Sequence, residues 1–154
     1  MSPDERHTHG RLEALATGVL AYPDGERLAC EVQLRYSADD PLVVRVVVPG
    51  NRARGGSWVL SRDLLSAGLS GAAGIGDVTV RPVAQEGAPL SVEIEVRSAG
   101  EPVRFVMGHR ALLTYLERSH ALVPFGTEAD HGAMERELEL FLDEGGPAEE
   151  AGNA

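Results

Sequence analysis

The glycine-rich stretch GLSGAAGIG, residues 68–76, is the first place in this sequence where residue types and spacing could support chemistry. A phosphate-binding P-loop requires a lysine, and all 14 basic residues of this chain are arginines. Dinucleotide-binding loops and nucleophile turns follow a strand and precede a helix, whereas here a predicted helix comes first and a strand follows. We therefore interpret the glycines as a turn in which Gly68 caps the end of the helix and the others reverse the chain.

Histidine, cysteine and carboxylate side chains do not form a recognisable catalytic or metal-binding pattern. The histidines are His7, His9, His109, His120 and His131. None of them has the spacing of a zinc motif. Cys30 lies on the apolar face of a predicted strand, where we expect it to be buried. Asp39, Asp40 and Asp77 lie at predicted turns, where aspartate commonly bonds its own backbone. We predict no catalytic residue, no metal site, no cofactor and no enzymatic activity.

Charge is distributed unevenly along the chain. The formal net charge is −10, of which residues 127–154 contribute −8 through nine acidic residues and one arginine. This balance disfavours non-specific binding to duplex nucleic acid, which depends on neutralising phosphates. No apolar run approaches the ~20 residues of a membrane helix, and the first residues lack the features of a signal peptide. We therefore expect a cytoplasmic protein that does not insert into a membrane.

Hydrophobic patterning predicts the elements that position these residues. Strands are expected at 14–21, 28–36, 42–48, 57–60, 77–83, 89–97 and 103–107, and helices at 62–67, 109–122 and from about 130. Alternation is clearest at 28–36, whereas 14–21 is a weaker pattern. We predict a disordered N-terminus over residues 1–10, a single α+β domain over 11–143, and an acidic disordered tail over 144–154.

Short motifs, taken in order, resemble the SsgA-like proteins, an actinobacterial sporulation and cell-division family. They are CEVQLRYSADDP at 30–41, WVLSRDLL at 58–65, GIGDVTVRP at 74–82, YLER at 115–118 and LVP at 122–124. The likeness spans roughly residues 14–142. This chain departs from the family at Leu42, where an aromatic residue is typical, and at Arg81, where tryptophan is typical. A second proline is common where Phe125 stands.

The resemblance implies a fold of two antiparallel β-sheets with packed helices, a Whirly-like order of strands, helix, strands and helix. It also implies a homotrimer. Family members look like non-catalytic regulators that mark septum sites, recruit the tubulin-like protein FtsZ, or tune wall synthesis. The expected function is an adaptor in sporulation septation that acts at division septa through FtsZ or another family member.

Four residues are candidates for partner binding. Leu42 and Arg81 are the two family departures, and Arg52 and Arg54 lie in a glycine-rich hairpin loop at 49–56. The alternative function is a single-stranded nucleic-acid-binding module, which the implied Whirly-like fold suggests. Such a module uses aromatic residues on a basic sheet face, and aromatic residues are 5% of this chain and lie mostly on predicted core faces. Nucleic acid is therefore not the expected partner.

Overall fold

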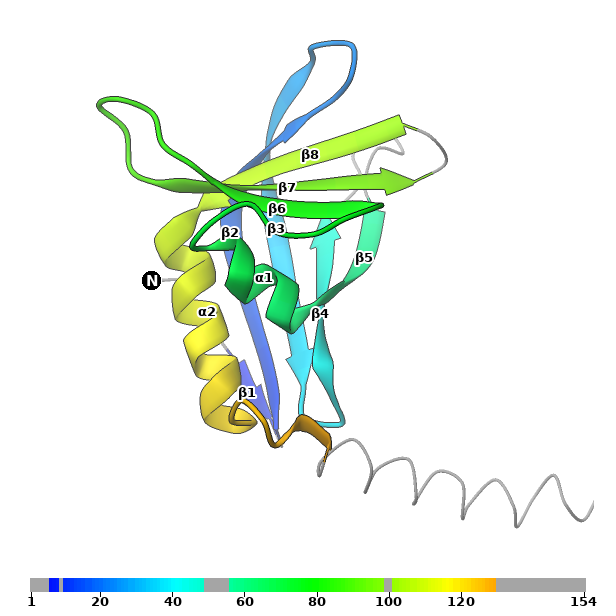
Figure 1. Cartoon of the computed structure of the whole chain (residues 1–154), viewed down its shortest axis with the longest axis vertical. Coiled ribbons are helices and arrows are strands. Elements are labelled where there is room, and N and C mark those ends of the chain that lie inside the picture. Colours follow the sequence, from blue (N-terminus) through cyan, green and yellow to red (C-terminus); the bar gives the residue numbers. More distant parts are fainter. Residues whose placement is uncertain (1–5, 9, 49–55, 99–100, 130–154) are drawn as a thin grey trace, which may run out of the picture.

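The computed structural model describes residues 6–8, 10–48, 56–98 and 101–129 of the 154. Within these ranges the chain forms eight strands and two helices (Figure 1). In chain order they are β1 (Arg6–Thr8), β2 (Arg11–Ala21), β3 (Arg27–Ser37), β4 (Asp40–Val48), β5 (Gly56–Ser61), α1 (Arg62–Gly68), β6 (Val78–Val83), β7 (Ser91–Ser98), β8 (Glu101–Gly108) and α2 (His109–Leu122). The predicted order of strands and helices is confirmed over this part of the chain. The helix expected from about residue 130, like the acidic tail, lies outside the described residues.

All eight strands belong to one antiparallel sheet, so the predicted fold of two Whirly-like sheets is wrong. The strand order is β5-β4-β3-β2-β8-β7-β6, with β1 paired to β2. Strands β6, β7 and β8 run across the direction of β2, β3 and β4, and the single sheet curls into a half-barrel (Figure 1).

Strand β2 is the reason that one sheet forms. It pairs with β3 from Arg11 to Ala21, and its last four residues, Gly18 to Ala21, also pair with β8. The sequence pattern of this segment is weak, because Ala16, Thr17 and Gly18 interrupt the alternation of large apolar residues. Strand β1 pairs with the beginning of β2, in a segment for which the sequence predicts disorder. The domain bounds of 11–143 stay a prediction.

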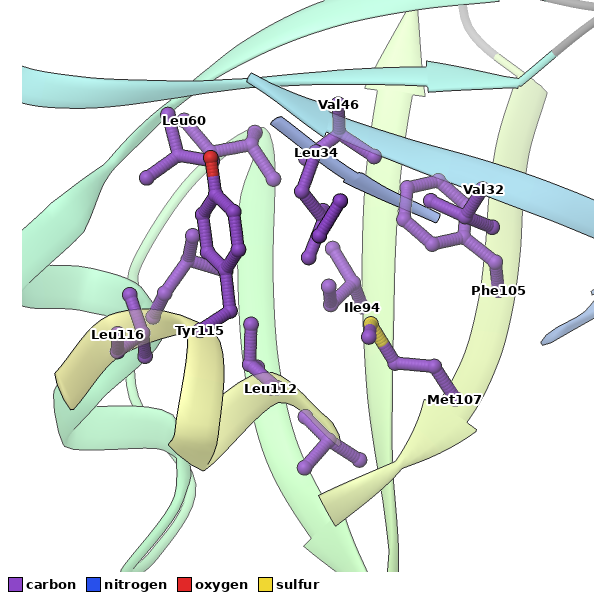
Figure 2. Packing of buried hydrophobic residues seen from close by; sticks show 14 of the residues in the cluster. Val32, Leu34, Val46, Leu60, Ile94, Phe105, Met107, Leu112, Tyr115 and Leu116 are labelled. Carbon is purple, nitrogen blue, oxygen red and sulfur yellow. The ribbon is translucent and has the colours of Figure 1, made fainter. Parts of the chain in front are cut away.

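The hydrophobic core lies between the concave face of the sheet and the two helices. Helix α2 buries Leu112, Tyr115, Leu116 and Ser119, the helically spaced positions that the sequence predicts. In Figure 2, side chains from α2 and from the strands point toward one another, including Leu34, Ile94 and Phe105. The hydroxyl of Tyr115 donates to the carbonyl oxygen of Leu12 at 2.7 Å, so its polar atom is satisfied inside the core.

Gly68 has a different role from the predicted one. The capping residue of α1 is Leu69, in a right-handed conformation, and Gly68 is the last residue of the helix. A Cβ atom on Gly68 would overlap the side chain of Val80, so glycine is required where α1 packs closely against β6. The turn interpretation of the later glycines is confirmed, since Gly74 and Gly76 have φ angles of 99° and 97°.

Replacing Gly68 with alanine is expected to lower the free energy of unfolding by about 1–3 kcal/mol, because the added methyl group overpacks the contact with Val80. Gly71→Ala is the matched control. No atom lies within 4 Å of a Cβ built at Gly71, and its effect should stay within about 1 kcal/mol in either direction. Urea denaturation of both variants measures the difference. Equal stabilities would contradict the close-packing role.

Candidate partner-binding surface

A row of side chains crosses four strands on the outer face of the sheet, the face opposite the helices. Glu13 of β2 lies opposite Arg35 of β3, Arg35 lies opposite Arg45 of β4, and Arg45 lies opposite Val59 of β5. Successive residues of a strand point to opposite faces. The neighbours of this row along the strands, such as Leu12, Leu34 and Val46, are core residues, so the row itself points outward.

The row lies in a surface cavity of about 270 Å³, which we call the outer-face cavity. Its lining residues are Arg11, Glu13, Arg35, Tyr36, Ser37, Asp40, Val43, Arg45 and Val59. Three arginines, two carboxylates and two valines therefore share one hollow. Val59 is 50% exposed, so the cavity offers apolar surface as well as charge.

Arg35 and Arg45 hydrogen-bond neutral partners. The Nη2 of Arg35 donates to Oε1 of Gln33 at 2.9 Å, and the Nη1 of Arg45 donates to Oγ of Ser57 at 3.3 Å. Like charges directly opposite each other in an antiparallel pair are destabilising. An anion bound between the two guanidinium groups would offset this repulsion.

Arginines on the same face of β6, β7 and β8 are arranged differently. The Nε of Arg81 contacts Oε2 of Glu93 at 2.6 Å. Arg97 and Arg104 both pair with Glu95, at 3.4 and 3.3 Å. The charges in this half of the sheet are thus balanced by cross-strand or neighbouring carboxylates, in contrast to the charge of Arg45, which lies opposite Arg35 and Val59.

The residues predicted from the sequence for partner binding do not gather in one place. Leu42 is 51% exposed and adjoins Val43, which lines the outer-face cavity. Arg81 lies in β6, and four strands separate β6 from β4 in the sheet order. Arg52 and Arg54 lie outside the described residues. The role of these four residues stays a prediction.

Sequence reasoning missed Arg35 and Arg45. The alternation of residues 28–36 places Arg35 on the polar face of its strand, which was visible in the sequence. Its position opposite Arg45 depends on the register of β3 with β4, which includes an irregularity between Arg35 and Ser37. Local patterns assign a side chain to a face but do not give its neighbour on the next strand.

The buried side chain of Arg62 lies on the core side of the sheet and holds Tyr36, the inward-facing neighbour of Arg35. Arg62 is the first residue of α1 and is 1% exposed. Its Nη1 donates to the hydroxyl of Tyr36 at 2.9 Å, and that hydroxyl donates to the Pro41 carbonyl at 3.0 Å. Its guanidinium carbon also lies 5.2 Å from the centre of the Tyr36 ring. Burial raises the pKa of Tyr36 to about 12, so the phenol stays protonated and able to donate.

Arg62 also caps the end of α2. Its Nη1 donates to the carbonyl oxygens of Ser119 and Val123 at 3.1 and 2.9 Å. The Ser119 carbonyl also accepts from the backbone N–H of Val123, whereas the Val123 carbonyl lies beyond the last helical hydrogen bond. The Nη2 of Arg62 donates to Oε1 of Glu128 at 2.9 Å. The same carboxylate oxygen accepts from the backbone N–H of Gly126 at 2.8 Å. One side chain therefore joins β3, α1, α2 and the segment that follows α2.

Glu128 makes this junction sensitive to acid. The backbone N–H of Gly126, and then the charge and hydrogen bond of Arg62, lower the pKa of Glu128. A folded-state pKa below the unfolded value stabilises the protein above the unfolded value, ~4.3, and this contribution is lost as pH falls through the folded pKa. We expect Glu128→Gln to reduce the loss of stability between pH 5 and the onset of acid unfolding, measured by urea denaturation at several pH values. An unchanged pH profile would contradict this role.

The remaining sequence candidates have structural positions. Cys30 is half-buried rather than buried, and desolvation raises the pKa of its thiol. His109 Nε2 lies 2.9 Å from the carbonyl oxygen of Leu69 and ties the start of α2 to the end of α1. Over the described ranges, no group of three or more histidine, cysteine, aspartate or glutamate side chains is arranged to hold a metal ion. No helix in that part of the chain has the length and apolar character required to span a membrane.

Comparisons with known proteins agree with one another. The family model described as Streptomyces sporulation and cell division protein, SsgA, matches residues 30–128. The chain is 35% identical over 123 residues to the sporulation-specific cell division protein SsgB of Saccharopolyspora erythraea. The alignment covers 80% of this chain and 86% of that protein. The chain is 34% identical over 136 residues to SsgB of Streptomyces coelicolor, and that alignment covers 88% of this chain and 93% of that protein.

Two solved structures are similar along most of their length. The crystal structure of an SsgA-like sporulation-specific cell division protein from Thermobifida fusca has a TM-score of 0.76 and 28% identity, and the match covers 88% of this chain and 99% of that one. A structure from work on SsgB mutations that correlate with longitudinal cell division during sporulation of Streptomyces coelicolor has a TM-score of 0.72 and 31% identity. That match covers 82% and 98% of the two chains.

Proposed function

Because the chain belongs to the SsgA family of sporulation and cell division proteins, we propose that it acts in sporulation septation as a non-catalytic adaptor. The observation that carries this proposal is the family match over residues 30–128, together with relatives that are named sporulation-specific cell division proteins. An adaptor works by binding, and the outer face of β2 to β5 offers exposed charge and apolar surface for that purpose.

The proposed partner is the division machinery at the septum, either FtsZ or another member of the family. Arg35 and Arg45 favour a partner that presents carboxylates, because complementary charge steers association and fixes orientation. The alternative of a single-stranded nucleic-acid module depended on a Whirly-like fold, and the single curled sheet removes that basis.

Deleting the gene in the bacterium that encodes this chain tests the role. We expect sporulation septa to be fewer or misplaced when they are imaged with a membrane dye, and a plasmid copy of the gene to restore them. A plasmid copy carrying Arg35→Gln and Arg45→Gln should restore septa less well than one carrying Arg97→Gln and Arg104→Gln. Normal septation in the deletion strain would argue against the proposal.

We also propose that the protein assembles as a homotrimer, as the family resemblance implies. Light scattering at micromolar concentration should give close to three times the chain mass of 16.4 kDa. A monomer mass that persists as the concentration is raised would contradict this assembly.

A further inference from the structure

The outer-face cavity combines positive charge with apolar surface. Arg45 is flanked across the strands by Arg35 on one side and Val59 on the other, so no carboxylate lies directly opposite it. Glu13 lies opposite Arg35, and Asp40 lines the same cavity, so three arginines face two carboxylates there. Arg45 is therefore the strongest point of attraction for an anion.

This arrangement is suited to a particular kind of ligand. Guanidinium groups bind carboxylates with short, charge-assisted hydrogen bonds, often two at a time. Val43 and Val59 line the same hollow and favour apolar side chains. A peptide in which carboxylates alternate with apolar residues would match both features, whereas a free inorganic anion would match only the arginines.

The chain itself contains such a peptide beyond the described residues. Residues 134–144 read MERELELFLDE. This stretch has five carboxylates, one arginine and five apolar side chains. It thus has the composition that the outer-face cavity would select.

The end of the described chain is tied to β3, the strand that carries Arg35, through contacts on the core side of the sheet. Glu128 is bonded to Arg62, and Arg62 is bonded to Tyr36, which lines the cavity. From Ala129 to Glu144 are 15 residues, which span up to about 50 Å when extended. A tethered peptide is present at an effective concentration of about 1 mM or more, so weak contacts suffice to fill the site.

We propose that residues 134–144 occupy the outer-face cavity of the free protein. Their carboxylates bind Arg35 and Arg45, and their apolar side chains cover Val43 and Val59. An acidic partner must then displace this segment before it reaches the arginines. The proposal concerns the isolated chain and does not depend on the role in septation.

Paramagnetic broadening in the full-length chain tests this. With Cys30→Ala and Gly145→Cys, a nitroxide is attached beside the segment, and backbone amide signals are compared with the label oxidised and reduced. We expect selective broadening at Val43, Arg45 and Val59 in low salt. It should decline in about 1 M salt, where charges are screened beyond ~3 Å.

Two pairs of substitutions locate the contact. Arg35→Gln with Arg45→Gln should lower the bound population about tenfold, because two exposed ion pairs are lost at once. Glu137→Gln with Glu139→Gln should do the same from the other side. Arg97→Gln with Arg104→Gln, which removes two arginines already paired with Glu95, should leave the broadening unchanged.

Three results would overturn the proposal. They are no selective broadening, broadening centred on another surface, and broadening at the cavity that persists in the Arg35 and Arg45 double variant. Addition of an unlabelled peptide of residues 130–154 should reduce the broadening by competition, and no reduction at millimolar peptide would also count against it. None of these outcomes bears on septation, which the deletion strain tests separately.

Discussion

Replacing Arg62 with alanine is expected to lower the free energy of unfolding by about 3–5 kcal/mol, the loss typical of breaking a buried charged network from one side. The substitution removes the hydrogen bonds that Arg62 donates to the Ser119 and Val123 carbonyls and to the Tyr36 hydroxyl, and it leaves a cavity where a 1%-exposed side chain was packed. It also leaves the carboxylate of Glu128, whose side chain is 12% exposed, without its cation. Urea denaturation followed by circular dichroism measures the change.

Two further variants separate the network from the charge alone. Arg62→Lys keeps the positive charge, but a single ammonium group cannot replace two η-nitrogens that reach different partners, so a clear loss of stability should remain. Arg110→Ala removes an exposed arginine near the start of α2 and should change stability by no more than about 0.5 kcal/mol. If Arg62→Ala were as mild as Arg110→Ala, the side chain would not be what fixes the end of α2.

The role of Arg62 could not be predicted from the sequence. Ser61 is the N-cap of α1, a residue type that is common at this position, and its hydroxyl accepts from the backbone N–H of Leu64 at 3.2 Å. The next residue, an arginine in the first turn of a short helix, is usually solvated. Its partners come from Tyr36, Ser119 and Glu128, which are 26, 57 and 66 residues away. No local pattern reports contacts at such separations.

The fold shows the same division between local and distant information. Alternation and helical spacing predicted most strands and both described helices, because these patterns record which side of an element is buried. The number of sheets depends on the pairing of Gly18 to Ala21 with Arg104 to Met107, strands that are far apart in the sequence. The register that places Arg35 beside Arg45 is equally non-local. The family resemblance implied two antiparallel sheets, and the structure has one.

Aromatic residues illustrate how burial decides the size of an effect. Trp58 is the single tryptophan of the chain. The structure places it in β5 as a half-buried side chain at the margin of the core. Its ring centre lies 5.5 Å from that of Phe105, at a tilt of 41°. Phe105 of β8 is fully buried beside Val32 and Ile94, as Figure 2 shows.

Phe105→Ala is therefore expected to lower the free energy of unfolding by about 3–5 kcal/mol, because it removes a fully buried ring and leaves a cavity. Trp58→Ala should cost less, since part of the indole already contacts water in the folded state. Phe105→Leu is the matched control and should cost about 1–2 kcal/mol, because most of the volume is retained. Urea denaturation followed by circular dichroism suits all three variants, because Trp58→Ala removes the only tryptophan signal. If Trp58→Ala were the more destabilising change, the indole would have to supply more of the contact between β5 and β8 than its half-burial indicates.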